Sequence, residues 1–244
     1  MSWASDLRVL YHMAVKPVRG ATHAERLEAF YRGQSGSYDD FRKRLLHGRE
    51  EMLAALPLPE GGRWLDIGGG TGHNVEAVGD RRARLAEVTV VDLCPSLLKQ
   101  AEQRIGRLGW TNVRLVEADA CTYQHDTGPV DAVTFTYSLT MIPDWFQAVR
   151  RAFDLLKPGG AIGVVDFYIS RKWPAPGMRR HSAFQRFFWP TWFGSDNVFP
   201  SPDHLPFLQS LFETERLEER LAGVPYLCGL KAPHYIFVGR KTTR

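Results

Sequence analysis

The chain has 244 residues, of which 44% are hydrophobic and 24% charged, so it can bury a sizeable core and is not an intrinsically disordered protein. A formal charge of +4 permits an anionic partner without requiring one. The cysteines, Cys94, Cys121 and Cys228, are far apart, so we expect no disulfide framework, no metal site and a cytoplasmic location. We also expect no signal peptide and no bilayer-spanning segment, because charged residues interrupt the first apolar residues and no later apolar run is long enough.

Residues 1–60 are predicted to form a helical N-terminal cap. Apolar residues between positions 2 and 16 recur on one helical face, which either packs on its own domain or seeks a membrane interface. The helical pattern resumes over 23–56 with a break at 33–36, and a helix is expected to begin near Ser37. The basic side of that helix is either solvated or closes over a ligand. Pro57 and Pro59 end the region.

From residue 61 to residue 244 the chain is expected to form one domain in which strands and helices alternate. Strand patterns cover 63–67, 88–92, 113–117, 130–137 and 161–167, and helix patterns cover about 72–78, 95–105 and 144–155. Two closing strands are expected at about 212–221 and 234–239. This succession predicts a doubly wound α/β fold with helices on both faces of the sheet.

A glycine-rich turn follows the first predicted strand, where residues 63–72 read RWLDIGGGTG. Glycine has no Cβ, so such a turn lets the backbone approach a cofactor closely. Asp92 ends the next strand, 92 − 72 = 20 residues beyond Gly72, which is the interval at which an acid commonly binds a ribose. A dinucleotide fingerprint requires a third glycine where this chain has His73, and a phosphate-binding Gly-x-x-x-x-Gly-Lys loop is absent from the sequence. The pattern therefore favours a nucleoside cofactor without a pyrophosphate.

Asp66-x-Gly68-x-Gly70-x-Gly72, together with Asp92 and Asp119, resembles the class I S-adenosylmethionine-dependent methyltransferases over roughly residues 60–170. The resemblance implies a Rossmann-like fold, whose mostly parallel seven-stranded sheet has an antiparallel last strand. It also implies S-adenosylmethionine as cofactor and S-adenosylhomocysteine as product. The residues that it assigns to the cofactor are Asp66 for the ammonium group, directly or through water, Gly68, Gly69, Gly70, Thr71, Gly72 and Asn74 for the methionine and ribose, Asp92 for the ribose hydroxyls, Leu93, Asp119 and Ala120 for the adenine, and Tyr137, Ser138, Leu139 and Ile142 beside the methyl-transfer site.

The acceptor is expected to be a small molecule or a lipid and not a nucleic acid. The place after the fourth strand, where nucleic-acid base methylases carry (Asn/Asp)-Pro-Pro-aromatic, begins here with Tyr137. Residues 30–50 read FYRGQSGSYDDFRKRLLHGRE and resemble the diacylglyceryl-homoserine N-methyltransferases of betaine-lipid synthesis, which add three methyl groups to the head-group amine. On this resemblance Gln34, Tyr38 and Arg49 belong to a cover over the cofactor.

Other functions stay open at this point. A related enzyme would be a phosphatidylethanolamine N-methyltransferase or a quinone C-methyltransferase. From other classes, a non-catalytic RNA-binding or cofactor-sensing protein would use the basic face, and a nicotinamide dehydrogenase would share the general fold.

Methyl transfer to an amine requires a neutral nitrogen and strict alignment. An α-amino group with a pKa of about 8 is already partly neutral, so positioning and desolvation can carry much of the catalysis. Aromatic faces can hold the cationic product at roughly 0.5–2 kcal/mol each. The catalytic candidates are Tyr31, Tyr137, Tyr168 and His181, with Trp173 as a further aromatic face and Arg42, Arg171, Arg179 and Arg180 as possible partners of the substrate carboxylate.

Residues 171–206 interrupt the alternation with basic residues, aromatic residues and six prolines. An insertion of this length is more often functional than a plain connection. Its aromatic residues either pack over the sheet or face a membrane, where Trp189 and Trp192 would lie in the interface and each cation near anionic lipid would contribute about 1 kcal/mol. The second interpretation makes the protein peripherally membrane-associated, with a lipid substrate and anionic lipids as partners.

Overall fold

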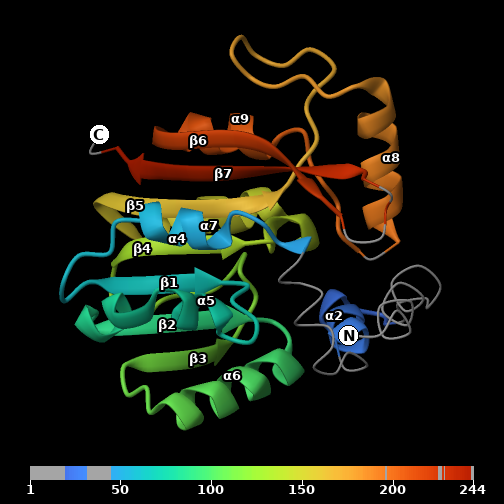
Figure 1. The fold of residues 1–244 in the computed structure, drawn as a ribbon. Coiled ribbons are helices and arrows are strands. Elements are labelled where there is room, and N and C mark those ends of the chain that lie inside the picture. Colours follow the sequence, from blue (N-terminus) through green and yellow to red (C-terminus); the bar gives the residue numbers. More distant parts are fainter. Residues whose placement is uncertain (1–19, 32–44, 196, 225–226, 228, 243–244) are drawn as a thin grey trace.

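The computed structural model describes residues 20–31, 45–195, 197–224, 227 and 229–242. These residues form a seven-stranded sheet in the order β3-β2-β1-β4-β5-β7-β6 (Figure 1). The helices expected within 2–16 and from Ser37 fall largely outside the described residues. The predicted division at residue 60 stays a prediction.

The strands confirm the predicted mostly parallel sheet. β1 to β5 pair in parallel, and β7 runs antiparallel to both β5 and β6. Their bounds are Arg63–Ile67 for β1, Glu87–Asp92 for β2, Val113–Glu117 for β3, Val130–Thr136 for β4, Leu156–Phe167 for β5, Phe212–Gly223 for β6 and Lys231–Lys241 for β7. Because β1 has β2 on one side and β4 on the other, the chain reverses its direction of winding between β1 and β4. Ligands bind at such a point, at the carboxyl ends of the strands.

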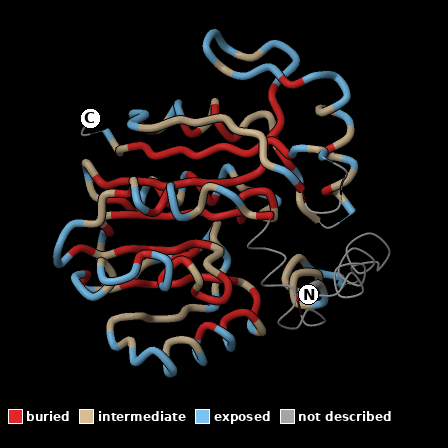
Figure 2. Tube along the Cα trace, in the orientation of Figure 1, coloured by how far each residue is buried: buried red, intermediate tan, exposed pale blue. Residues whose placement is uncertain are grey.

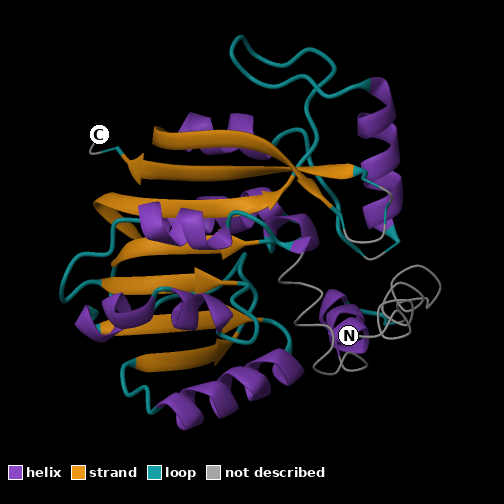
Figure 3. Ribbon diagram, in the orientation of Figure 1, coloured by secondary structure: helices purple, strands orange, loops and turns teal. Residues whose placement is uncertain are grey.

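Helices cover both faces of the sheet (Figure 3). Their bounds are His23–Tyr31 for α2, Arg49–Ala55 for α4, His73–Ala77 for α5, Pro95–Leu108 for α6, Trp145–Leu155 for α7, Ala183–Gly194 for α8 and His204–Leu211 for α9, with short 3-10 helices η1 at Gly79–Arg84 and η2 at Leu139–Met141. The helix expected over 72–78 continues as η1. The insertion at 171–206 contains α8 and the start of α9, which the sequence analysis did not predict. Within the described part of the chain, no helix combines the length and the apolar character needed to traverse a bilayer.

The core lies along the central strands, which are buried on both faces (Figure 2). The near-continuous apolar run over 161–167, in the second half of β5, suits such a position. The indole N–H of Trp64 in β1 donates to Oγ1 of Thr134 in β4 at 2.9 Å, so the one polar atom of this buried ring is satisfied. α4 packs closely on β5. There is no room for a Cβ at Gly163 in β5, where it would collide with the sulfur of Met52 in α4.

α8 closes the carboxyl end of β5. Phe193 stacks on Phe167 with 4.5 Å between the ring centroids, and Trp189 stacks on Phe193 at 5.4 Å. Trp189 is only 1% exposed, so the expectation that it lies in a membrane interface is wrong: its ring belongs to the core. Trp192 is half-buried, on the same helix.

Candidate functional site

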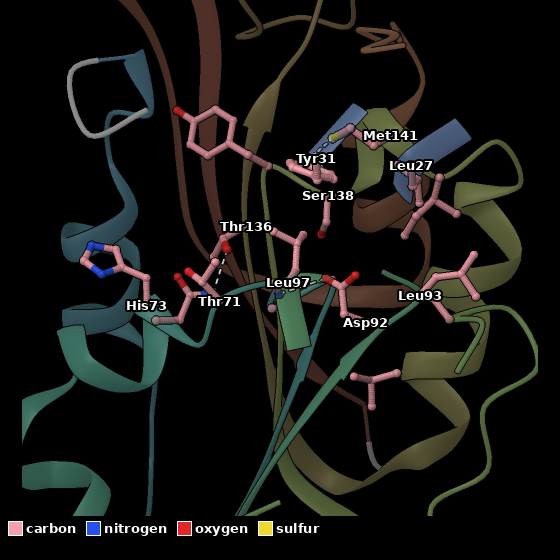
Figure 4. A pocket seen from close by; sticks show the side chains of 18 of the residues that line it. Leu27, Tyr31, Thr71, His73, Asp92, Leu93, Leu97, Thr136, Ser138 and Met141 are labelled. Atoms are coloured by element: carbon pink, nitrogen blue, oxygen red, sulfur yellow. Dashed lines mark hydrogen bonds between the residues drawn. The ribbon is translucent and has the colours of Figure 1, made fainter. Parts of the chain in front are cut away.

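A cavity of about 390 Å³ lies at the point where the winding reverses, at the carboxyl ends of β1, β2 and β4 (Figure 4). The glycine turn, the β2–α6 junction and the segments after β3 and β4 contribute its lining, and α2 covers one side. Residues predicted for the site that line it are Tyr31, Arg49, Gly68, Gly69, Gly70, Thr71, Asn74, Asp92, Leu93, Asp119, Ala120, Tyr137, Ser138 and Ile142.

The glycine turn packs so tightly that side chains have no room in it. A Cβ on Gly68 would come within 2.5 Å of the Ser138 Cβ, and one on Gly69 within 2.5 Å of an oxygen of Asp66. Gly70 differs, because a Cβ there would meet only Leu97 at 3.6 Å and Asp92 at 3.8 Å. Gly68 and Gly69 therefore hold the turn against its own protein neighbours, whereas Gly70 presents bare backbone next to the cavity.

Asp66 does not line the cavity, although the sequence predicted that it contacts the cofactor. Its carboxylate is fully buried and accepts from the Asn74 side-chain amide at 2.9 and 3.0 Å and from the Thr134 hydroxyl at 2.7 Å. Burial raises the pKa of Asp66 to about 6, although these hydrogen bonds and the nearby charge of Arg49 act in the opposite direction. Asp66 thus orients Asn74, which does line the cavity. Gly72 does not reach the cavity either, because it forms the cap of α5.

Asp92 connects the glycine turn to the β2–α6 junction. One carboxylate oxygen accepts from the backbone N–H of Gly70 at 2.8 Å and the other from that of Cys94 at 2.9 Å. In the next strand connection, Asp119 accepts from the backbone N–H of Cys121 at 2.8 Å. Two carboxylates thus stand at the ends of β2 and β3, on the same edge of the sheet, and both line the cavity.

Tyr137 has a backbone that is unusual for a residue other than glycine, with φ of 53°. Its N–H donates to the carbonyl of Val165 at 2.7 Å and its hydroxyl to the carbonyl of His47 at 2.6 Å, and these contacts hold the conformation. Burial raises the pKa of Tyr137 well above its ordinary value. The hydroxyl of Tyr137 therefore keeps its proton and is already used as a donor, so its ring is the part left to interact with a ligand.

α2 lies over the cavity and contributes the predicted Tyr31 together with two residues that the sequence reasoning missed, His23 and Leu27. His23, Leu27 and Tyr31 follow one another at four-residue spacing, so they share a helical face, and all three line the cavity. The Tyr31 hydroxyl donates to the sulfur of Met141 at 3.2 Å, and Figure 4 shows the two side chains beside each other. Burial lowers the pKa of His23, with a further contribution from Arg26.

Two of the predicted catalytic residues lie away from the cavity, so that prediction is corrected. The Tyr168 hydroxyl donates to Glu219 in β6 at 2.7 Å, and its ring packs edge-on against His181. His181 Nδ1 accepts from the backbone N–H of Ser170 at 3.0 Å, and burial lowers the pKa of His181 to about 4. The physical reason is that the chain turns toward the β6–β7 edge after β5 and carries both residues with it.

The other predicted residues take varied places. Leu139 is fully buried and does not line the cavity, and Gln34, Tyr38 and Arg42 lie outside the described residues. Arg171 pairs with Asp203 at 2.7 Å, and Arg179, Arg180 and Trp173 are exposed on the insertion. Met141 and Ala118 also line the cavity, within the segments after β4 and β3 that the sequence assigned to the site. Cavity residues that the sequence analysis did not assign to the site include His73, Glu76, Val91, Leu97, Arg104, Arg107, Cys121, Thr136, Pro143 and Asp144.

The lining fits a nucleoside with a charged amino-acid end. The Asp92 carboxylate is suited to accept hydrogen bonds from vicinal hydroxyls, and Leu93 and Leu97 offer apolar surface for a base. Bare backbone at Gly70 lies between them, so no Cβ fills the space. Among the described residues, His, Cys, Asp and Glu form no group of three or more that could hold a metal ion.

Residues 65–160 match a family model described as a methyltransferase domain. The ubiquinone/menaquinone biosynthesis C-methyltransferase UbiE of Edwardsiella ictaluri is 26% identical over 162 residues, 64% of this chain and 64% of that protein. The 2-phytyl-1,4-naphtoquinone methyltransferase of Thermosynechococcus vestitus is 27% identical over 226 residues, 84% of this chain and 96% of that protein. Among solved structures, Phospholethanolamine N-methyltransferase 2 of Haemonchus contortus, in complex with phosphomonomethylethanolamine and S-adenosylhomocysteine, has a TM-score of 0.68 at 15% identity, covering 91% of this chain and 61% of that one.

The match to UbiE proteins spans 64–66% of their length, slightly under two thirds. The structural likeness confirms the fold predicted from the sequence, and the cofactor predicted with it, S-adenosylmethionine, is confirmed at the level of the domain. Residues 65–160 of this chain are therefore similar to a methyltransferase domain and lie within the seven-stranded fold that such domains have.

Proposed function

We propose that the protein transfers methyl groups from S-adenosylmethionine to the amine of a diacylglyceryl-homoserine head group, giving the trimethylated betaine lipid. The cofactor supplies an electrophilic sulfonium methyl when bound. Asp92, Asn74 and the backbone around Gly70 hold it, and Arg49 is placed at the cavity to pair with a carboxylate. What remains for the protein is to receive a neutral amine, align it and exclude water.

The observation that carries the amine acceptor is the chemistry at the end of the cavity after β4. Tyr31, Tyr137 and Met141 all line the cavity, and the thioether of Met141 accepts from the Tyr31 hydroxyl at 3.2 Å. Aromatic rings stabilise a cation by contact, at roughly 0.5–2 kcal/mol each, and the methylated amine is a cation. His23 interacts with Asp119, so the one imidazole on α2 stands at the adenine end.

The rival acceptor, a quinol ring carbon, makes a different demand. Such a carbon becomes nucleophilic when the neighbouring hydroxyl loses its proton, which calls for a base. Tyr137 is unsuited to that role, because burial raises its pKa and its hydroxyl already donates to the His47 carbonyl. The resemblance of residues 30–50 to the betaine-lipid N-methyltransferases also supports the amine.

Quinone C-methylation remains the second candidate, because the curated relatives named above are quinone C-methyltransferases. Its support is sequence similarity, which in the Thermosynechococcus vestitus protein extends beyond residues 65–160 to 84% of this chain.

The test presents three acceptors separately in mixed detergent micelles: diacylglyceryl-homoserine, phosphatidylethanolamine and a demethylated quinol. S-adenosylmethionine with a labelled methyl group is added, and mass spectrometry of the lipid locates each added methyl. We expect transfer to the homoserine nitrogen in up to three steps. Transfer to the quinol alone would establish the second candidate, and transfer to phosphatidylethanolamine alone would move the acceptor to another head group. Cofactor binding without transfer to any of the three would overturn both proposals.

A further inference from the structure

α8 presents an aromatic face, which we call the α8 stripe: the exposed Phe184, Phe187 and Thr191, with the half-buried Phe188 between them. These positions fall on one side of a helix. Phe184 is 57% exposed and Phe187 is 73% exposed. The one hydroxyl of the stripe is turned inward, because Thr191 Oγ1 donates to the backbone carbonyl of Phe187 at 2.8 Å. The stripe is therefore apolar in effect as well as in composition.

The helix is held firmly with this face outward. Trp189 and Phe193, on the opposite side, are 1% and 2% exposed and pack on the end of β5. A capping box fixes the start of α8: the Ser182 hydroxyl accepts from the Gln185 N–H at 3.1 Å, and the Gln185 side chain accepts from the Ser182 N–H at 3.0 Å. Exposure of the stripe is thus a property of the packed fold, and contiguous exposed apolar surface marks a place of contact.

The charge around the stripe identifies the occupant. The stretch 171–195 contains five Arg or Lys residues and no Asp or Glu, and of these cations Arg171 is paired with Asp203 at 2.7 Å. Trp173, 69% exposed, carries the Arg180 guanidinium over its ring at 4.4 Å and the Lys172 ammonium at 5.7 Å. Aromatic rings interleaved with cations suit the interface of a bilayer that contains anionic lipid, where each cation contributes about 1 kcal/mol.

The stripe is also linked to the cavity. Phe199, 57% exposed, lies just beyond the end of α8, and its backbone N–H donates to the Thr140 carbonyl in η2 at 2.7 Å. The next residue of η2, Met141, lines the cavity. Figure 1 shows α8 at the same end of the sheet as α2, where the strands end. A surface that rests on α8 thus brings a bilayer to the end of the molecule at which the acceptor enters.

We infer that the α8 stripe, with Trp173, Lys172 and Arg180 beside it, is the docking surface for an anionic lipid bilayer. The inference deepens the proposed function, since it rests on that function for the reason why a bilayer is needed: the acceptor carries acyl chains. The binding itself depends on neither methyl transfer nor the identity of the acceptor.

The experiment is co-sedimentation with phosphatidylcholine vesicles that do or do not contain phosphatidylglycerol, without cofactor or acceptor. We expect the wild type to bind the anionic vesicles. Phe184→Ser/Phe187→Ser should weaken partition at least about tenfold, equivalent to about 1.4 kcal/mol. Lys172→Glu/Arg180→Glu should weaken binding to anionic vesicles selectively. The matched control is Phe146→Ser, which removes an exposed ring on α7 and should leave partition unchanged.

Unchanged partition of the Phe184→Ser/Phe187→Ser variant would overturn the inference, and so would equal loss in the Phe146→Ser control. Sedimentation velocity adds a further check: if the double variant converts a dimer to a monomer, the stripe is an interface between copies of the chain and the inference is wrong. Affinity for S-adenosylhomocysteine should be the same in all variants, which confirms that they are folded. Because vesicle binding and methyl transfer are measured separately, failure of the docking surface and failure of the proposed acceptor give different results.

Discussion

Asp92→Asn keeps the shape of the side chain and removes its charge. In the structure the two carboxylate oxygens accept from the backbone N–H groups of Gly70 and Cys94, at 2.8 and 2.9 Å. Asn has a single carbonyl oxygen, so one of these N–H groups loses its acceptor. A ribose placed in the cavity loses an ionised acceptor at the same time, in a buried setting where water screens little.

The size of the effect follows from these contacts. A hydrogen bond to a charged group contributes about 1.5–3 kcal/mol. If the carboxylate accepts from two ribose hydroxyls, its loss weakens binding by about 3–6 kcal/mol, which is roughly a 100- to 10,000-fold rise in Kd. We therefore expect calorimetric titration with S-adenosylhomocysteine to give a Kd at least about 100-fold above that of the wild type.

Glu117→Gln is the matched control for this substitution. Glu117 in β3 is the register partner of Asp92 in β2, and it is exposed and outside the cavity lining. Its replacement by Gln removes the same charge as Asp92→Asn. Its Kd should stay within about twofold of the wild type, because exposed charges interact weakly. A folded Asp92→Asn protein that binds within about threefold of the wild type would refute the placement of the ribose at β2.

Two further predictions concern stability. Gly68→Ala should lower the free energy of unfolding by more than about 2 kcal/mol, because its Cβ would come within 2.5 Å of Ser138. Gly70→Ala should lower it by only about 1–2 kcal/mol, from left-handed strain, because the nearest neighbour of its Cβ would be Leu97 at 3.6 Å. Urea denaturation compares the two variants, and equal losses would contradict the packing argument. Burial raises the pKa of Asp166 to about 7 in the folded protein, above its ordinary value of 3.8, so its contribution to stability is complete below that ordinary value and is lost as pH rises through about 7. Between about pH 4 and 8 the unfolding free energy of Asp166→Asn should therefore fall less than that of the wild type, by up to about 4 kcal/mol. If the two proteins have the same pH profile, the raised pKa of Asp166 is wrong.

The sheet was predictable because each central strand ends in a distinctive signal. Residues 63–67 and 113–117 were predicted with the bounds that the structure has. The same logic placed Asp92 at the cavity, since the end of a parallel strand fixes where its last side chain stands. It could not show that Asp66 stands behind the cavity lining, because strand position does not reveal that Asn74 and Thr134 donate to its carboxylate.

Residues beyond the alternating region were harder to place. Tyr168 and His181 follow β5 in sequence, but the direction of the chain after β5 depends on packing against β6, which no local pattern encodes. α8 carries Pro190 and six aromatic residues among twelve, so neither a helical period nor a helical composition marks it. Which aromatic ring faces inward is likewise decided by contact with Phe167 and not by residue type.

Two of the hydrogen bonds that hold α2 against its neighbours involve a sulfur atom. The Tyr31 hydroxyl donates to the Met141 thioether, and the Cys94 thiol donates to Glu28 at 3.2 Å. Burial raises the pKa of Cys94 to about 11, so the thiol keeps its proton and stays a donor. Sulfur is a weak partner in either role.

Replacing spent cofactor after each transfer requires the cavity to open, and α2 forms one of its walls. Hydrogen bonds that involve sulfur cost less free energy to break than hydrogen bonds between oxygen and nitrogen. A hydrogen bond from the backbone N–H of Ser96 to Glu28 at 3.2 Å also holds α2, whereas α8 packs its buried rings on β5. We therefore expect the wall on the α2 side to open more readily between turnovers than α8 leaves its packing on β5.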